Sequence, residues 1–282
     1  MAVSPSSSVR QAREALAQRL RDIRIEAGLS ARAIAQAAGW HESKCSRIEH
    51  ARTAPSADDI RAWCAACGAE SEIPDLLASL RAADTAYVEW RRLQVTGLKH
   101  LQQSYIPLYE RTRRFRSYQP AVIPGMLQTP GYATALLGSI AAAHQAPDDS
   151  LEASEARVDR QRLLYEGEKE FTFLIEEPVL RCRIGDNDVM AGQLRHLADA
   201  LSLPSVSLGV IPAQARRRMW PLEGFLMFDD TTVQVELLSA RVTVTRPGEI
   251  DLYIRAFTEL GRMAVYGRQA RKLICAALAA IS

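Results

Sequence analysis

Cysteine and histidine are scarce in this chain of 282 residues, which has five of each. The cysteines are odd in number and lie far apart, at Cys45, Cys64, Cys67, Cys182 and Cys275. No apolar leader segment of the kind that directs secretion precedes them, so a disulfide framework is not expected. The sequence therefore predicts a cytoplasmic protein with reduced thiols.

Long apolar runs and a large net charge are also missing. No stretch approaches the roughly 18–20 apolar residues that span a bilayer, so no membrane partner is expected. The formal net charge is only +2. Locally, residues 10–61 hold ten Lys/Arg against seven Asp/Glu, and residues 91–116 hold seven against one. Such basic islands suit an anionic partner, although a solvated helix face has the same composition.

Signatures of catalysis and of metal binding are absent as well. The chain has no glycine-rich phosphate loop, no H-E-x-x-H and no G-x-S-x-G. Cys64 and Cys67 form a lone C-x-x-C without a second pair of ligands, so they are read as small buried residues. The adjacent acids Glu176 and Glu177 follow a predicted strand and are read as a solvated turn. We expect a protein that is not an enzyme and that holds no metal and no cofactor.

The first third of the chain has helical periodicity. Apolar residues recur at spacings of three and four, serines stand at helix starts, and Gly28 and Gly39 stand where helices stop. The predicted helices span 6–28, 29–39, 41–50, 57–68 and 74–93. Short helices separated by glycine turns indicate a helix-turn-helix, in which residues 41–50 would enter the major groove of DNA.

Residues 41–50, the expected reading helix that would contact the bases, have an inner and an outer face. Trp40, Cys45 and Ile48 would point inward, and His41 stands where a helix cap is usual. Base contacts are expected from four outward residues, Glu42, Ser43, Lys44 and Ser46. Phosphate contacts are expected from the three arginines Arg32, Arg47 and Arg52. Surface positions without a role are the alternative for each of them.

Residues 12–68 resemble the Cro/phage-repressor (XRE) class of regulators. The resemblance rests on "LRDIRIEAGLSARAIAQAAGW" followed by "SKCSRIEHARTAPS". It implies an ion pair between Arg24 and Glu49 that fixes the orientation of the reading helix. Three residues depart from the pattern of the class: Ala31 replaces a glutamine, His41 a Ser/Thr cap, and Ala51 a glycine.

The second half has a different composition. β-branched and aromatic residues predict strands over 171–177, 205–213, 224–230 and 233–238, and the last two are expected to form a hairpin. Predicted helices flank them at 150–167, 187–202, 249–265 and 268–281. The chain is thus expected to combine an all-α domain at 8–72, a helical linker at 73–118 and an α+β domain at 119–282.

From about residue 75 onward the sequence resembles actinobacterial regulators of the WhiJ-like family and their C-terminal domain of unknown function. The segments that carry the resemblance are "IPGMLQTPGYA", "EARVDRQRLL", "FTFLIEEPVLRCRIG" and "VMAGQLRHL". Members of this family are often encoded beside a very small partner protein, and some such pairs are antitoxin-like. The resemblance therefore implies a small protein as a partner.

Two segments of the second half, one between Tyr118 and Tyr132 and one at Met219 and Trp220, have the composition of a partner or ligand groove. Exposed methionines and aromatic residues suit such a surface, whereas a purely structural turn is the alternative. The groove candidates are Tyr118, Met126, Leu127, Tyr132, Met219 and Trp220.

Taken together, these features predict a sequence-specific DNA-binding transcription regulator that acts as a homodimer. Its C-terminal domain would receive a signal from the small partner protein. A regulator that binds a small-molecule effector in a deep cavity is the first alternative. An enzyme or toxin tethered to DNA is the second, and it would need a cleft with convergent titratable groups.

Overall fold

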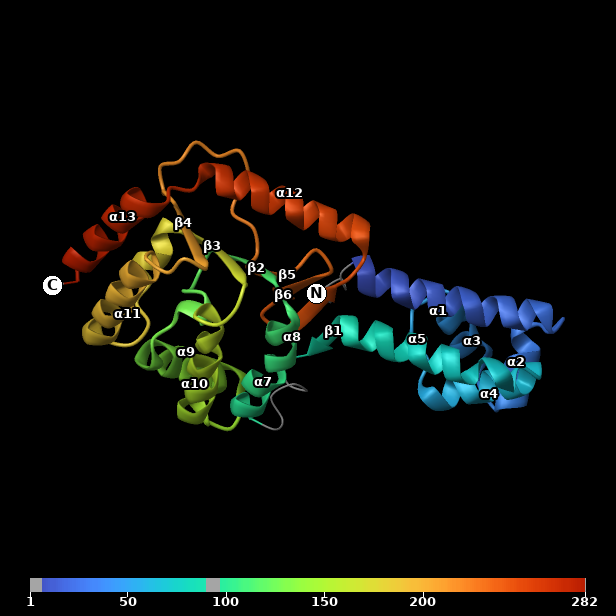
Figure 1. The fold of residues 1–282 in the computed structure, drawn as a ribbon. Coiled ribbons are helices and arrows are strands. Elements are labelled where there is room, and N and C mark those ends of the chain that lie inside the picture. Colours follow the sequence, from blue (N-terminus) through green and yellow to red (C-terminus); the bar gives the residue numbers. More distant parts are fainter. Residues whose placement is uncertain (1–6, 90–96, 282) are drawn as a thin grey trace. The chain divides into compact units, whose positions relative to one another are not determined.

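The computed structural model describes residues 7–89 and 97–281 (Figure 1). The chain divides into two compact units, Met1–Val88 and Glu89–Ser282.

The first unit is helical. Its elements are α1 (Ser7–Glu26), α2 (Ala31–Ala38), α3 (Glu42–Glu49), α4 (Ala57–Cys67), a short 3-10 helix (Glu70–Glu72) and α5 (Ile73–Ala86). Apolar residues from all five α-helices form one core, in which Leu20, Ile34, Ile48, Ile60 and Trp63 are almost fully buried. The indole Nε1 of Trp63 donates to the Leu20 carbonyl at 3.0 Å, so the largest core side chain has its polar atom satisfied.

Local signals set the ends of these helices. The Ser30 hydroxyl accepts from the Ala33 amide at 3.1 Å and begins α2, and Gly39 ends it with φ of 68°. Ser56 and Asp59 form a reciprocal capping box at the start of α4. The helix expected at 74–93 ends earlier than predicted, because 87–89 form the short strand β1 (Tyr87–Glu89). Residues 90–93 lie outside the described part of the chain.

The second unit contains a mixed sheet, which confirms the predicted α+β class. Six of its strands are β2 (Arg114–Gln119), β3 (Glu170–Glu176), β4 (Val206–Ile211), β5 (Phe225–Phe228), β6 (Thr232–Glu236) and β7 (Ala240–Val244). They lie in the order β7-β6-β5-β2-β3-β4. β2, β3 and β4 are parallel, whereas β5 runs antiparallel to β2 and to β6. The hairpin predicted between β5 and β6 is therefore confirmed.

Two strands differ from the sequence-based expectation. Residues 114–118 were predicted to end a helical linker, but they belong to β2, which pairs with β3 on one side and β5 on the other. The prediction was wrong because the charges of "RFRSYQ" hide a strand whose Phe115, Ser117 and Tyr118 are buried. The strand β7, which pairs with β6, was not predicted at all.

Helices cover both faces of this sheet (Figure 1). They are α7 (Leu98–Ser104), α8 (Ile106–Arg111), α9 (Pro130–His144), α10 (Ser150–Asp159), α11 (Asn187–Ala200), α12 (Pro247–Met263) and α13 (Gly267–Ala279). Successive side chains of β3 point to opposite faces of the sheet and pack against the helices on each face. Phe171 and Phe173 join the large cluster that includes side chains of α9, α11 and α13, whereas Leu174 lies against Gly261 of α12.

Among the described helices, none has both the length and the apolar content that crossing a membrane requires. Within the same residues, no group of three or more His, Cys, Asp or Glu side chains could hold a metal ion.

Candidate functional site

Helix α3 presents one face to the core and one to solvent. Cys45 and Ile48 are buried, and the loop before the helix is fixed by the Trp40 amide, which donates to the Ala35 carbonyl at 2.7 Å. The exposed side chains of α3 and its C-terminal cap are Glu42, Ser43, Ser46, Arg47 and His50. This set alternates with the buried positions at helical spacing, so α3 has a continuous outer face.

His41 caps this helix, as predicted. Its Nδ1 accepts a hydrogen bond from the Ser43 amide at 3.3 Å and lies 2.9 Å from the Ser43 hydroxyl. With Nδ1 as an acceptor in both contacts, the hydroxyl of Ser43 donates to it. An imidazole thus takes the place of the usual Ser/Thr side chain at a helix start.

The ion pair implied for Arg24 and Glu49 is present. Arg24 Nε lies 2.5 Å from Glu49 Oε1, and its Nη2 lies 3.3 Å from Glu49 Oε2. The remaining Nη1 donates to the Leu29 carbonyl at 2.7 Å. The side chains of Arg24 and Glu49 are only 14% and 7% exposed. The guanidinium therefore ties α3 to α1 and to the loop before α2, and the bidentate geometry fixes the orientation of α3.

Lys44 does not lie free on the outer face, which corrects our prediction for it. Its Nζ lies 2.6 Å from Asp59 Oδ1 of α4 and 4.4 Å from the centroid of the Trp40 ring. Burial is the largest single effect on the Asp59 carboxyl and raises its pKa, but the hydrogen bonds from Lys44 and Ser56 and the Lys44 charge together outweigh burial and lower the pKa below its usual value. Lys44 is thus half-buried and braces α3 against α4.

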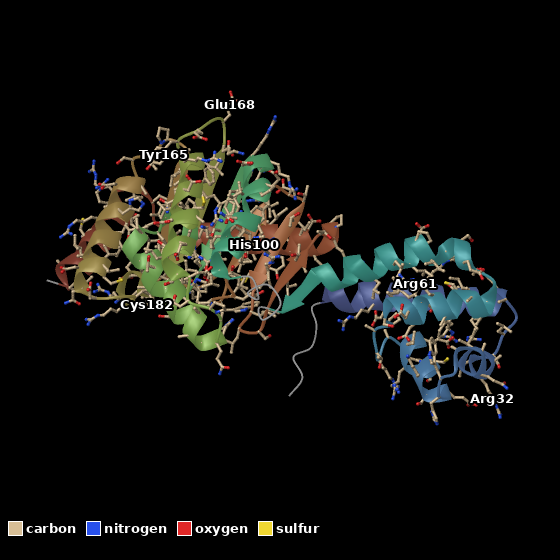
Figure 2. The ribbon with its side chains drawn as sticks, turned by 90° about the horizontal axis from the view of Figure 1, so that it is seen from below. Arg32, Arg61, His100, Tyr165, Glu168 and Cys182 are labelled. Atoms are coloured by element: carbon tan, nitrogen blue, oxygen red, sulfur yellow. The ribbon has the colours of Figure 1, made fainter. Side chains whose placement is uncertain are left out.

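The three arginines assigned to phosphate are all exposed. Arg32, 81% exposed, projects outward from α2 and forms a 3.2 Å pair with Glu42, itself 60% exposed (Figure 2). Such a surface pair contributes less than about 1 kcal/mol, so a phosphate could replace the carboxylate at little cost. Arg47 and Arg52 form no ion pair with the described residues. The Arg52 amide donates to the Arg47 carbonyl at 2.8 Å, and this hydrogen bond holds the backbone after α3 close to the end of the helix.

Ala51 follows this helix with φ of 52°, the left-handed conformation in which glycine is usual. A methyl group is strained there, so we expect Ala51→Gly to raise the free energy of unfolding of the first unit by about 1 kcal/mol. Urea unfolding at equilibrium measures this change. Ala65→Gly at an exposed position of α4, where the backbone is helical, is the matched control and should lower stability by a similar amount. Equal destabilisation by both substitutions would contradict the assignment of strain to Ala51.

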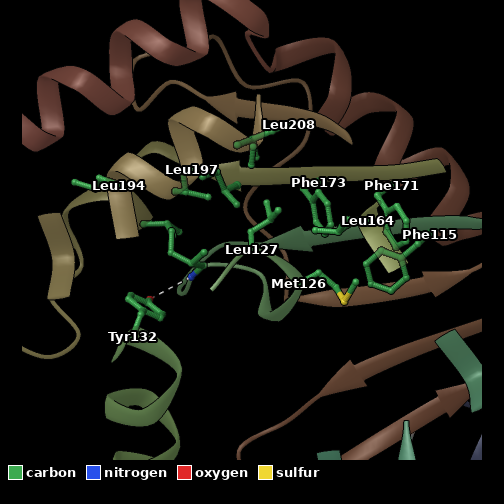
Figure 3. Packing of buried hydrophobic residues seen from close by; sticks show 14 of the residues in the cluster. Phe115, Met126, Leu127, Tyr132, Leu164, Phe171, Phe173, Leu194, Leu197 and Leu208 are labelled. Carbon is green, nitrogen blue, oxygen red and sulfur yellow. Dashed lines mark hydrogen bonds between the residues drawn. The ribbon is translucent and has the colours of Figure 1, made fainter. Parts of the chain in front are cut away.

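Four of the six groove candidates belong to the core instead. Tyr118, Met126, Leu127 and Tyr132 are at most 1% exposed, and Figure 3 shows three of them among the packed side chains. The Tyr132 hydroxyl accepts from the Ile123 amide at 3.2 Å, and the segment around it seats α9. The prediction of an exposed lip is therefore wrong for these four residues, because methionine and aromatic side chains fill cores as readily as interfaces.

The other two groove candidates lie in the loop before β5. Trp220 is 67% exposed and Met219 is half-buried. Two of the arginines beside them form ion pairs within the second unit. Arg217 pairs with the buried Glu176 through two hydrogen bonds of 2.8 and 2.6 Å, and Arg218 pairs with Glu259 at 3.0 Å. The loop is therefore fastened to the sheet and to α12, and Trp220 is its exposed apolar side chain.

The second unit also contains a partly open cavity of about 530 Å³ that sequence reasoning did not locate. Its lining comes from α7, β2, the turn before α9, α9 itself, α10 and the end of β6. Met126 is the one groove candidate among the lining residues. The lining residues are spread over the sequence between Leu98 and Leu238, so no local pattern could have brought them together.

Two family matches cover most of the chain. Residues 15–80 match a helix-turn-helix domain. Residues 102–275 match the family described as a domain of unknown function, DUF5753. No curated protein and no solved structure matches the chain.

Proposed function

The chain belongs to the DUF5753 family and carries a DNA-binding helix-turn-helix domain at its N-terminal side, and from this premise we propose that it is a sequence-specific transcription regulator. The observation that carries the proposal is the outer face of α3. Glu42, Ser43 and Ser46 stand exposed in the first part of a helix whose orientation is fixed by the Arg24–Glu49 pair. Such a helix places its N-terminal residues against base edges in the major groove.

Phosphate contacts complete this arrangement. Arg32, Arg47 and Arg52 project from α2, from the end of α3 and from the loop after it. Positive groups on both sides of the reading helix neutralise the two phosphate backbones that border the groove. Lys44 is assigned to bracing rather than to base recognition, because its ammonium is held by Asp59.

We further propose that the protein binds DNA as a homodimer. Helix-turn-helix proteins read two half-sites about one turn of DNA apart, roughly 34–36 Å, because a single short helix covers too few base pairs for specificity. Selection from a random pool of duplexes tests it, and a two-fold symmetric site with half-sites 10–11 base pairs apart is the expected result.

Arg47→Ala is expected to weaken binding to the selected duplex about tenfold and to reduce the slope of log affinity against log salt by about one. The physical reason is that the variant contacts one phosphate fewer and therefore releases one counterion fewer from the DNA on binding. Arg255→Ala on α12 is the matched control, since Arg255 is an exposed arginine of the other unit. Fluorescence anisotropy over a salt series measures both variants. An unchanged salt slope in Arg47→Ala would contradict the phosphate contact.

The signal received by the second unit has two candidate sources. The small partner protein implied by the resemblance would dock on an exposed surface, of which Trp220 is the apolar part. The second candidate is a small-molecule effector, and the cavity favours it. Pockets that bind drug-sized molecules have volumes of about 300–1,000 Å³, and this cavity lies within that range.

A further inference from the structure

The cavity of the second unit is apolar over most of its wall. Leucine, isoleucine and aromatic side chains from α7, α9, β2 and β3 supply it, among them Leu101, Leu136, Ile140, Phe115 and Phe173. Figure 3 shows Phe115 and Phe173 beside Met126, which also lines the cavity. Leu136 and Ile140 are one turn apart on α9, are only partly buried, and both line the cavity. A wall of this kind accepts the apolar body of a ligand.

Two arginines stand in this apolar wall without a carboxylate partner. Arg157 donates from Nε to Gln102 Oε1 at 3.2 Å and from Nη1 to Gln128 Oε1 at 2.6 Å. Arg160, 4% exposed, donates to the Gln102 carbonyl at 3.2 Å and lies over the Tyr109 ring at 4.4 Å. Neither forms an ion pair with any described residue. Their hydrogen bonds and ring contact therefore orient both guanidinium groups, while the charge of Glu236 acts on them without a close ion pair.

The same region has polar atoms that lack a partner. The Arg160 Nε and the Ser117 hydroxyl are buried and make no hydrogen bond in the described structure, and both residues line the cavity. Buried polar groups are satisfied in the great majority of cases, so such atoms beside a cavity indicate a missing acceptor. The Ser117 side chain is fully buried on β2, with the cavity beside it.

The charges around the cavity do not cancel. Glu236, at the end of β6, is the acidic group of the lining, and its register partner on β7 is Arg241. Arg241 lies over the Tyr105 ring at 5.2 Å. Burial and the neighbouring charge of Arg160 lower the pKa of Arg157 to about 10, which is the direction expected for cations crowded in a low-dielectric space. Three arginines against one carboxylate leave an excess of positive charge.

We propose that this cavity binds a small molecule with an apolar body and one acidic group, and that Arg157 and Arg160 pair with the acid. The inference rests on the proposed function, since it names the class of effector that the second unit of the regulator would receive. The acid would supply the close ion pair that both guanidinium groups lack and an acceptor for the Arg160 Nε and the Ser117 hydroxyl. Its apolar body would occupy the space between α7, α9 and the sheet.

A comparison of acids with neutral molecules of the same shape tests this inference. The probes are decanoate against decanol and 2-naphthoate against 2-naphthol, measured by isothermal titration calorimetry on the full chain without DNA. An apolar cavity that lacked an available cation would prefer the alcohol of each pair, because burying an unpaired carboxylate is costly. We expect the opposite for at least one pair, with the acid bound about tenfold more tightly or better.

Substitutions then test whether the preference for the acid over the alcohol arises in the cavity. Arg160→Gln is expected to remove the preference for the acid while the alcohol still binds, and Arg157→Gln should weaken the preference in the same direction. Arg162→Gln is the matched control, because Arg162 is an exposed arginine on the same segment and pairs with Glu110. Leu136→Trp fills the cavity from α9 without touching the arginines, and both members of the preferred pair should bind at least tenfold more weakly.

Preference for the alcohol in both pairs, or no binding of any probe, would overturn the inference. So would a preference for the acid that persists in Leu136→Trp. These outcomes do not depend on whether Arg160→Gln folds, because the wild-type chain and Leu136→Trp decide them. Since no DNA is present, failure here leaves the proposed DNA binding intact. Failure to select a duplex would likewise leave the binding of the acid intact.

Discussion

Arg24→Ala is expected to lower the free energy of unfolding of the first unit by about 3–5 kcal/mol. The substitution leaves the Glu49 carboxylate, 7% exposed, without its partner, and the Leu29 carbonyl loses its side-chain donor. A buried charge without a counter-charge costs far more than the loss of a neutral hydrogen bond. Urea unfolding followed by the fluorescence of the buried Trp63 measures the change.

The double variant Arg24→Met with Glu49→Leu separates loss of the pair from loss of packing. Because both charges are removed and the volumes are kept, most of the stability should return. A loss of less than 1 kcal/mol in Arg24→Ala would show that the pair contributes no more than an exposed one. The functional consequence is orientation of the reading helix, so Arg24→Ala should also reduce DNA affinity under conditions in which the first unit is still folded.

The first unit could be predicted from its sequence because its signals are local. Ser30, Gly39 and Ser56 act on backbone groups within a few residues, and their cap geometries are present in the structure. His41 and Ala51 were identified through the resemblance to the XRE class, as the residues that replace a Ser/Thr cap and a glycine, and the structure has a cap and a left-handed residue at these positions. The serine and glycine signals depend on neighbours inside one turn of chain.

Lys44 shows where such local reasoning fails. Its place at the start of α3 predicts an outward side chain, but the partner that holds it, Asp59, is fifteen residues away in another helix. Periodicity gives the face of a helix and not the tertiary partner of a long, flexible side chain. The buried Met126 and Tyr132 differ from the groove prediction for a related reason, since composition does not distinguish an apolar interface from a core.

The cavity and the strands β2 and β7 depend on the fold as a whole. β2 alternates charged with buried residues, and only its pairing with two neighbours shows that it is an internal strand of the sheet. Arg157 and Arg160 lie in the segment 150–167, which was predicted only as a helix flanking the strands. Their hydrogen bonds with Gln102, more than fifty residues earlier, place them inside the unit. Long-range pairings of this kind leave no periodic trace in the sequence.

Arg217→Ala is expected to lower the free energy of unfolding of the second unit by about 3 kcal/mol. Glu176 was predicted to lie in a solvated turn, but its side chain is only 5% exposed. Arg217 satisfies both carboxylate oxygens, and the Tyr118 hydroxyl donates to Oε1 at 2.9 Å. Without the guanidinium, Tyr118 remains the donor to a charge held at the end of the parallel strand β3. Thermal and urea unfolding of the full chain measure the loss.

The next residue provides the control. Arg218 pairs with Glu259 in an exposed position, with the arginine side chain 61% exposed, so Arg218→Ala should cost less than about 1 kcal/mol. Glu176→Gln added to Arg217→Ala removes the unpaired charge and should restore part of the stability. Equal losses for Arg217→Ala and Arg218→Ala would contradict a buried pair and would place Glu176 in contact with water. A large loss in Arg217→Ala alone would instead mean that one carboxylate, that of Glu176, fastens the loop bearing Trp220 to the sheet. A partner that docks on Trp220 would then bind a loop whose position is already fixed.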